Sequence, residues 1–178
     1  MAAQSTYTPI ATTTYASPGV NYVFSNIPQT YTDLVLVVYG RNTYPTATNA
    51  INMYINTTTQ SSSNWSQTNL NGTGTGNSAS HQTTSTPDYG ASTSLPSASA
   101  TANLFGLAEF HIMNYASTIM TKTVLIRGSY DLNGSGALDL NVANYQSTVA
   151  VTSLQIGSGY GYNYAAGTTF TLYGITAA

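Results

Sequence analysis

Apolar residues in this chain recur at every second position in short runs, and the runs end at Gly, Pro, Asn or Ser. A period of two is typical of β-strands that bury one face. Thr, Val, Ile and Tyr dominate the runs, and these side chains fit a pleated sheet but lose rotamer freedom in a helix. The pattern predicts strands at Tyr7–Thr14, Val20–Phe24, Asp33–Tyr39, Ala50–Asn56, Leu104–Tyr115, Thr121–Arg127, Leu138–Tyr145, Thr148–Ile156 and Thr168–Ile175.

Eight or nine short strands with short connections predict an all-β fold, an antiparallel β-sandwich arranged as a jelly roll. The length of 178 residues fits a single domain spanning 1–178. The apolar phase within the runs also predicts which side chains are buried. The expected core consists of Leu34, Leu36, Val38, Phe110, Ile112, Val124, Ile126, Phe170 and Leu172.

The segment 57–103 is almost wholly polar and is expected to be a long loop or arm that leaves the sandwich. Loops of this length without structure of their own are usually functional or disordered. Trp65, Leu70 and Tyr89 stand out within it as apolar anchors. Two alternatives stay open: the loop embraces a neighbouring subunit or a glycan, or it folds back over its own sandwich.

Charge is scarce along the whole chain, which has three Lys or Arg and five Asp or Glu, and this changes what kind of surface we expect. The fifteen Tyr, with many Ser, Thr and Asn, suit lasting contact with another surface, because Tyr combines an apolar ring with a polar tip. Three scattered basic residues offer no footprint for nucleic acid. We also expect no signal peptide, since the start has no basic residue and no apolar run, and no membrane span.

Chemistry-bearing motifs are few, and we expect no enzyme and no cofactor. The chain has no Cys, no G-x-S-x-G and no H-E-x-x-H. Glu109 and His111 share one face of a predicted strand and could in principle act together as acid and base. A hairpin centred near Thr118 would instead place Glu109 opposite Arg127, and we favour this cross-strand ion pair.

One segment weakly resembles a calcium loop. Its candidate ligands are Asp131, Asn133, Ser135 and Asp139. Position twelve of such a loop is normally a bidentate Glu, and here it is Val142. Because Asn-Gly and Ser-Gly also suit a tight β-turn, the sequence favours a turn without metal.

Three stretches carry a family resemblance: Tyr7–Thr14, Ile27–Val37 and Ala166–Ile175, supported by the Val149–Ile156 run. They resemble small jelly-roll virion structural proteins of tailed bacteriophages, especially cyanophages, and segments near the ends of phage tail fibres. The resemblance covers the two ends of the chain and about half of its length. It implies a module on the outside of a virion.

The resemblance and the uncharged surface together favour a capsid cement or decoration protein. We expect it to bind the major capsid protein and copies of itself, as a trimer, on the outer capsid surface after synthesis in the host cytoplasm. The alternative is a tail-fibre or tail-associated module that binds a host glycan. Besides the loop anchors, the interaction residues expected from the tyrosine-rich turn are Tyr160, Tyr162 and Tyr164, because aromatic rings stack on sugar faces.

Overall fold

The structure, a computed structural model, describes residues 6–56, 64–83 and 91–176. These ranges form twelve strands and one 3-10 turn. The strands are β1 (Tyr7–Thr14), β2 (Asn21–Phe24), β3 (Asp33–Gly40), β4 (Thr48–Ile55), β5 (Trp65–Gly72), β6 (Asn77–Thr83), β7 (Ala91–Pro96), β8 (Gly106–Ile112), β9 (Lys122–Asp131), β10 (Gly136–Tyr145), β11 (Leu154–Ser158) and β12 (Thr169–Ile175), and the turn is η1 (Gly159–Gly161). Among the described residues, no helix has the length and hydrophobicity that a membrane crossing requires.

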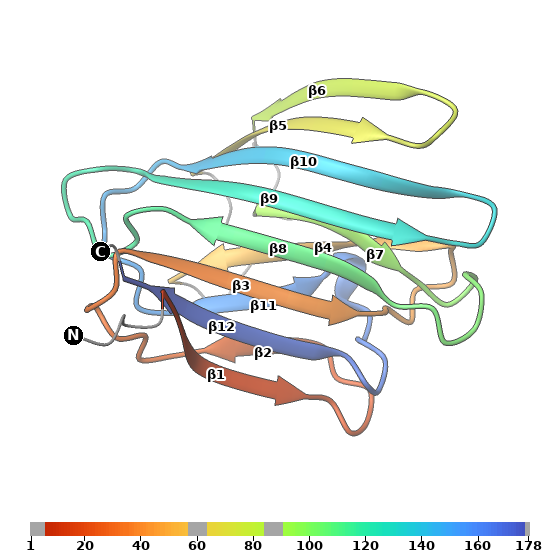
Figure 1. Ribbon diagram of the computed structural model, residues 1–178, viewed down its shortest axis with the longest axis horizontal. Helices are drawn as coiled ribbons and strands as arrows, with labels where there is room; N and C mark the ends of the chain where they lie inside the picture. Colours follow the sequence, from red (N-terminus) through yellow and green to blue (C-terminus); the bar gives the residue numbers. More distant parts are fainter. Residues whose placement is uncertain (1–5, 57–63, 84–90, 177–178) are drawn as a thin grey trace.

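Two antiparallel sheets pack face to face, the larger nearer the viewer in Figure 1. The large sheet has the order β1-β12-β3-β8-β9-β10-β5-β6, and the small sheet has the order β2-β11-β4-β7. Eight of these strands form the antiparallel pairs β1·β12, β2·β11, β3·β8 and β4·β7. Within the large sheet β12 also pairs with β3, and within the small sheet β11 also pairs with β4. This nested pairing is the strand order of a jelly roll, so the predicted fold class is confirmed.

Four further strands extend the large sheet beyond the jelly roll. The hairpin β9–β10 pairs with β8, and the hairpin β5–β6 pairs with β10. Figure 1 shows the two hairpins continuing the large sheet past the edge of the small one. As a result the large sheet has eight strands and the small sheet four.

The core lies between the two sheets, and all nine side chains expected there are buried. Leu36 of β3 lies opposite Phe110 of β8 and Leu172 of β12, so three neighbouring strands present apolar side chains to the same space. Burying a side chain of this size stabilises the fold by about 1.5–3 kcal/mol. The alternation of buried and exposed positions therefore anchors the register of the large sheet.

The segment 57–103 is not the long loop that the sequence led us to expect. Its described part contains β5, β6 and β7, so the described residues form twelve strands where eight or nine were predicted. The prediction failed because these strands are polar. The inner face of β5 carries Gln67, which bonds to the backbone of Ser92 in β7 instead of packing against an apolar layer.

The predicted strand Thr148–Ile156 is shorter than expected. Pairing begins only at Leu154, where β11 meets β2 and β4, and residues 148–153 run as an irregular segment. Val151 in that segment is nevertheless fully buried. The apolar side chain of Val151 therefore reflects burial at the edge of the core and not membership of a strand.

Candidate interaction surfaces

The outward face of the large sheet exposes a band of aliphatic side chains, which we call the outer stripe. Its members are Leu70, Leu107, Leu138, Leu140 and Val142, with exposed fractions between 40% and 69%. Leu140 lies opposite Leu70, and Leu138 and Leu107 flank Ser129. Opposite residues of antiparallel strands share a face, so the register itself gathers the stripe. A contiguous apolar band on a rigid sheet is typical of a contact site.

Beside the outer stripe lies the ion pair that the sequence predicted. Glu109 of β8 is directly opposite Arg127 of β9, and their side chains bond to one another. His111 on the same face does not join them. Its Nε2 atom lies 3.2 Å from Oδ2 of Asp33, and the other carboxylate oxygen of Asp33, Oδ1, accepts a hydrogen bond of 2.7 Å from the backbone N–H of Asn114. Glu109 and His111 are therefore each held by a different partner.

The three basic residues of the chain all bind within the molecule. Arg41 donates to four backbone carbonyls of the 98–104 segment, at 2.7–3.2 Å. Lys122 is fully buried and donates to the carbonyls of Ser117, Met120 and Thr148. Burial lowers the pKa of the Lys122 ammonium. With Arg127 bound to Glu109, the surface offers almost no cation to a partner.

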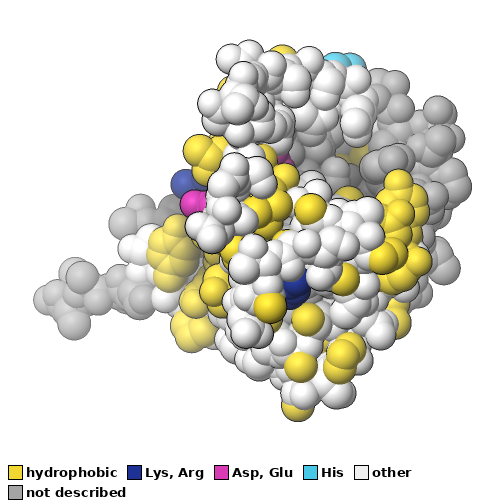
Figure 2. Space-filling view, turned by 90° about the vertical axis from the view of Figure 1, so that its right-hand side faces the viewer, with side chains coloured by type: hydrophobic (Ala, Val, Ile, Leu, Met, Phe, Trp, Pro, Cys, Tyr) yellow, Lys and Arg dark blue, Asp and Glu magenta, His cyan; other side chains and the backbone are white. Residues whose placement is uncertain are grey.

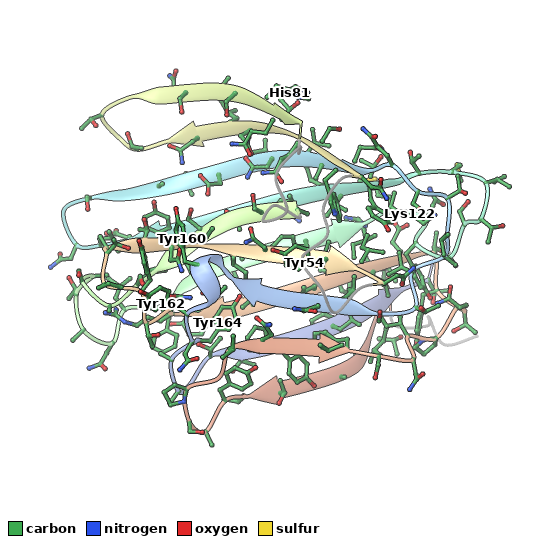
Figure 3. The ribbon with its side chains drawn as sticks, turned by 180° about the vertical axis from the view of Figure 1, so that it is seen from behind. Tyr54, His81, Lys122, Tyr160, Tyr162 and Tyr164 are labelled. Carbon is green, nitrogen blue, oxygen red and sulfur yellow. The ribbon has the colours of Figure 1, made fainter. Side chains whose placement is uncertain are left out.

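Tyr160 and Tyr162 form an exposed aromatic cluster with Tyr44. The rings of Tyr44 and Tyr160 stack at 5.1 Å, and the ring of Tyr162 meets Tyr44 edge-on at 4.7 Å. Tyr160 is 78% exposed and has a φ of 56°, a left-handed conformation that is costly for a bulky residue. Figure 3 shows Tyr160 and Tyr162 side by side at the turn after β11. Both remain candidate contact residues.

Buried amides fix the backbone under this aromatic cluster. Asn42 accepts a hydrogen bond of 2.7 Å from the Tyr44 backbone, and Asn49 donates one of 2.9 Å to the Gly159 carbonyl. Asn42 and Asn49 are also joined to one another at 3.2 Å. Since the two segments that carry the rings share one buried network, the strained Tyr160 conformation is held by its surroundings.

Two of the expected anchors are core residues, and here the predictions were wrong. Trp65 is buried in β5 and packs against Tyr145 at 5.0 Å. Tyr164 is fully buried and meets Phe170 edge-on at 5.1 Å, because its backbone bonds to Gly19 and draws the ring inward. Leu70, by contrast, is half exposed on the outer stripe. Tyr89 lies outside the described residues.

The candidate calcium loop is a β-turn between β9 and β10. Asn133 and Gly134 take the positive φ values of 59° and 124° that such a turn needs, and Asp131 accepts a hydrogen bond of 2.8 Å from the Asn133 backbone. Asp139 is opposite Gly128, three positions from Asp131, so the two carboxylates project to opposite faces of the sheet. The structure does not bring the four candidate ligands Asp131, Asn133, Ser135 and Asp139 together around one point.

An open groove of about 780 Å³ lies where the β5–β6 and β9–β10 hairpins end. Its aromatic lining includes Tyr39, which is 54% exposed, Phe105, stacked on Tyr39 at 5.5 Å, and Tyr130. Hydroxyl and carboxylate groups of the two hairpins face it, among them Thr73 and Asp131. Figure 2 looks onto this end of the molecule and shows hydrophobic patches with few charged side chains among them. Sequence reasoning missed this groove because four segments far apart in the sequence form it.

No protein-family model, curated protein or solved structure matches this chain. The functional argument therefore rests on the chain's own surfaces: the outer stripe, the aromatic cluster and the groove.

Proposed function

We propose that this protein is a bacteriophage virion structural protein, a capsid cement or decoration protein. It binds the major capsid protein on the outer surface of the head as a homo-oligomer and stabilises the particle. The observation that carries this proposal is the outer stripe. Five aliphatic side chains stand exposed on a rigid sheet, and such a surface is suited to a permanent apolar contact.

The way the charges are used supports a lasting contact over an electrostatically steered one. Arg41 and Lys122 bind backbone carbonyls, and Arg127 binds Glu109. The remaining surface is wetted by hydroxyl and amide groups. On a particle, many copies of one weak contact act together, and their combined affinity greatly exceeds that of a single contact.

The placement of the resembling segments also supports the proposal. Tyr7–Thr14, Ile27–Val37 and Ala166–Ile175 contain β1, most of β3 and β12, which are adjacent in the large sheet. These three stretches therefore lie in one contiguous part of the large sheet, and the supporting Val149–Ile156 run leads into β11 of the small sheet. The strands that carry most of the outer stripe, β5 and β10, lie outside these stretches. This arrangement fits a family whose members share the jelly-roll module and differ in the added strands that contact the partner.

Binding to purified phage heads tests this function. Heads that lack the protein are incubated with it, pelleted, and imaged by electron microscopy. We expect saturable binding at regular lattice positions and heads that withstand heating better. Density confined to the tail, or no binding at all, would overturn the proposal.

The groove favours a second candidate, a tail-associated module that binds a host glycan. Tyr39 offers an exposed aromatic ring, and hydroxyl groups of both hairpins surround it. Pockets of about 300–1,000 Å³ suit ligands of oligosaccharide size. Binding of host-surface oligosaccharides that is lost in Tyr39→Ala, together with density at the tail, would favour this function over capsid decoration.

A further inference from the structure

Three of the four sheet edges in the described structure are closed to another strand. An open edge presents unpaired N–H and C=O groups, and proteins close edges with Pro, bulges, short strands or covering groups. β1 carries Pro9 and an irregular register between Pro9 and Ala11, and β2 has only four residues. At β7 the side chains of Gln67 and Asn141 bond to the backbone of Ser92, at 2.9–3.0 Å.

The fourth edge, β6, has none of these protections. It runs for seven residues, Asn-Ser-Ala-Ser-His-Gln-Thr, without Pro and without a formally charged side chain. Its register with β5 is unbroken from Asn77 to Thr83. Residues 77–82 are all exposed, and no described strand pairs with the outer side of β6. A flat, regular and uncharged edge of this kind is ready to accept a strand.

We infer that β6 pairs in antiparallel fashion with β6 of a second copy of this chain, around a two-fold axis at Ser80. This register sets Asn77 opposite Thr83 of the other copy and Ala79 opposite His81. A second copy is the occupant that the strand itself favours. Self-pairing brings no like charges together, and Asn, Ser, Gln and Thr side chains can both donate and accept hydrogen bonds to their equivalents.

The two-fold geometry has a consequence for the outer stripe. Antiparallel pairing keeps opposite side chains on the same face, so the two large sheets continue as one and present both outer stripes on the same side. If the proposed function holds, on which this step rests, a dimer binds the capsid with two equivalent apolar surfaces at once. A pair formed through one isologous edge takes the place of the trimer expected from the sequence.

Single cysteines test the pairing, because the natural chain has no Cys. In the inferred register Ser80 meets its own equivalent at a Cα separation of about 4.5–5.5 Å, within the range of a disulfide. Cys in place of Ser78 would face Gln82, roughly 13 Å from its equivalent, too far to bridge. Thr12→Cys lies on the closed edge strand β1, so its rate of cross-linking gives the background from random collisions. We expect Ser80→Cys to form an oxidised dimer far faster than Ser78→Cys or Thr12→Cys.

A result in which Ser80→Cys cross-links no faster than the Thr12→Cys control overturns the inference. Equal cross-linking of all three variants also overturns it, because that reports chance encounters. The seven-residue contact is smaller than the roughly 1,600 Å² of a standard interface. Trapping by a disulfide is therefore more sensitive than mass alone.

Charge at the axis gives an independent measurement on the reduced protein by sedimentation over a range of concentrations. We expect Ser80→Lys to weaken the dimer about five-fold, since like charges then lie directly opposite. Mixing Ser80→Lys with Ser80→Asp should restore it as a heterodimer. A trimer mass, or a monomer unaffected by either variant, contradicts the inference. A dimer that fails to bind heads refutes only the proposed function, whereas a monomer that still binds them refutes only the edge pairing.

Discussion

The guanidinium group of Arg41 donates a hydrogen bond of 2.7 Å to the backbone carbonyl of Thr101. Further bonds reach the carbonyls of Ala98, Ala100 and Leu104, so one side chain holds the whole connection that leads to Phe105 in the groove. The planar guanidinium carries five N–H donors in a fixed fork, so it can bond to several carbonyls at once. The residue thus supports the shape of the groove without facing a ligand.

We predict that Arg41→Ala lowers the free energy of unfolding by about 1–3 kcal/mol, because four backbone carbonyls, two of them in part-buried bonds, lose their charged donor. Arg127→Ala is the matched control. Its side chain is 59% exposed and pairs with Glu109 across neighbouring strands, and such surface pairs contribute only about 0–1 kcal/mol. Urea unfolding of both variants checks the difference, and equal losses would contradict the role given to Arg41.

The buried hydroxyl of Tyr164 predicts an alkaline limit to stability. No described group bonds to this oxygen, and burial raises the pKa of Tyr164 well above its usual value of 10.0. In the unfolded chain the phenol loses its proton near pH 10, while in the folded protein it keeps it. The stability that the neutral phenol gives is therefore complete below pH 10 and is lost as the pH rises above it, by up to about 1.4 kcal/mol per pH unit.

Lys122 has the opposite effect on the pH dependence. Burial lowers the pKa of its ammonium in the folded protein, so the free energy of unfolding rises as the pH approaches the pKa of Lys122 in the unfolded chain from below. Burial also raises the pKa of Tyr15, Tyr115 and Tyr130. More groups therefore lower the stability at alkaline pH than raise it. We expect Tyr164→Phe to raise stability at neutral pH by about 1 kcal/mol, by removing an unbonded hydroxyl, and to soften the decline above pH 10. Thermal melts from pH 7 to 11 test both effects. A less stable Tyr164→Phe protein would show that the hydroxyl has a partner.

The sequence predicted those parts of the fold in which apolar residues alternate along a strand. The register of Glu109 with Arg127 followed from a short connection and one buried face, and both held. Strands β5 and β6 escaped prediction because their partners are polar. Gln67 faces the edge of β7, and residues 77–82 of β6 are exposed on both faces, so neither strand shows an apolar period.

Aromatic residues could not be sorted into core and surface by sequence. Trp65 stands in a polar run yet packs against Tyr145, while Tyr160 lies in a tyrosine-rich turn and is exposed. Tyr162 and Tyr164 are two positions apart in the same turn, but only Tyr164 is drawn inward by its backbone bonds to Gly19. Such differences depend on contacts between residues far apart in the sequence, as Trp65 is from Tyr145 and Gly19 from Tyr164.

The outer stripe can be separated from general hydrophobicity by two matched variants. Leu140→Ser removes an aliphatic side chain from the centre of the stripe, and Val149→Ser removes one that is exposed elsewhere, on the irregular segment before β11. Because both side chains are at least partly in water, neither change should shift the melting temperature by more than a few degrees. We expect Leu140→Ser to weaken binding to phage heads at least about ten-fold and Val149→Ser to leave it unchanged. Similar binding by both would remove the stripe from the interface.

Ionic strength tests the kind of contact that the charges allow. Exposed charges are screened over about 10 Å at 0.1 M salt and about 3 Å at 1 M, so an interface steered by charge weakens steeply over this range. Here Arg41 and Lys122 bind carbonyls and Arg127 binds Glu109, which leaves an apolar and hydroxyl-rich surface for the partner.

We therefore predict that binding to heads changes less than about three-fold between 0.05 and 1 M sodium chloride, because little charge remains to be screened. Co-sedimentation across that series measures it, with heads alone as the control for particle integrity. Ammonium sulfate should strengthen binding, since this salt favours the burial of apolar surface. Release of the protein from intact heads at high sodium chloride would mean that the capsid is recognised through charge, and the outer stripe would then lose its assigned role.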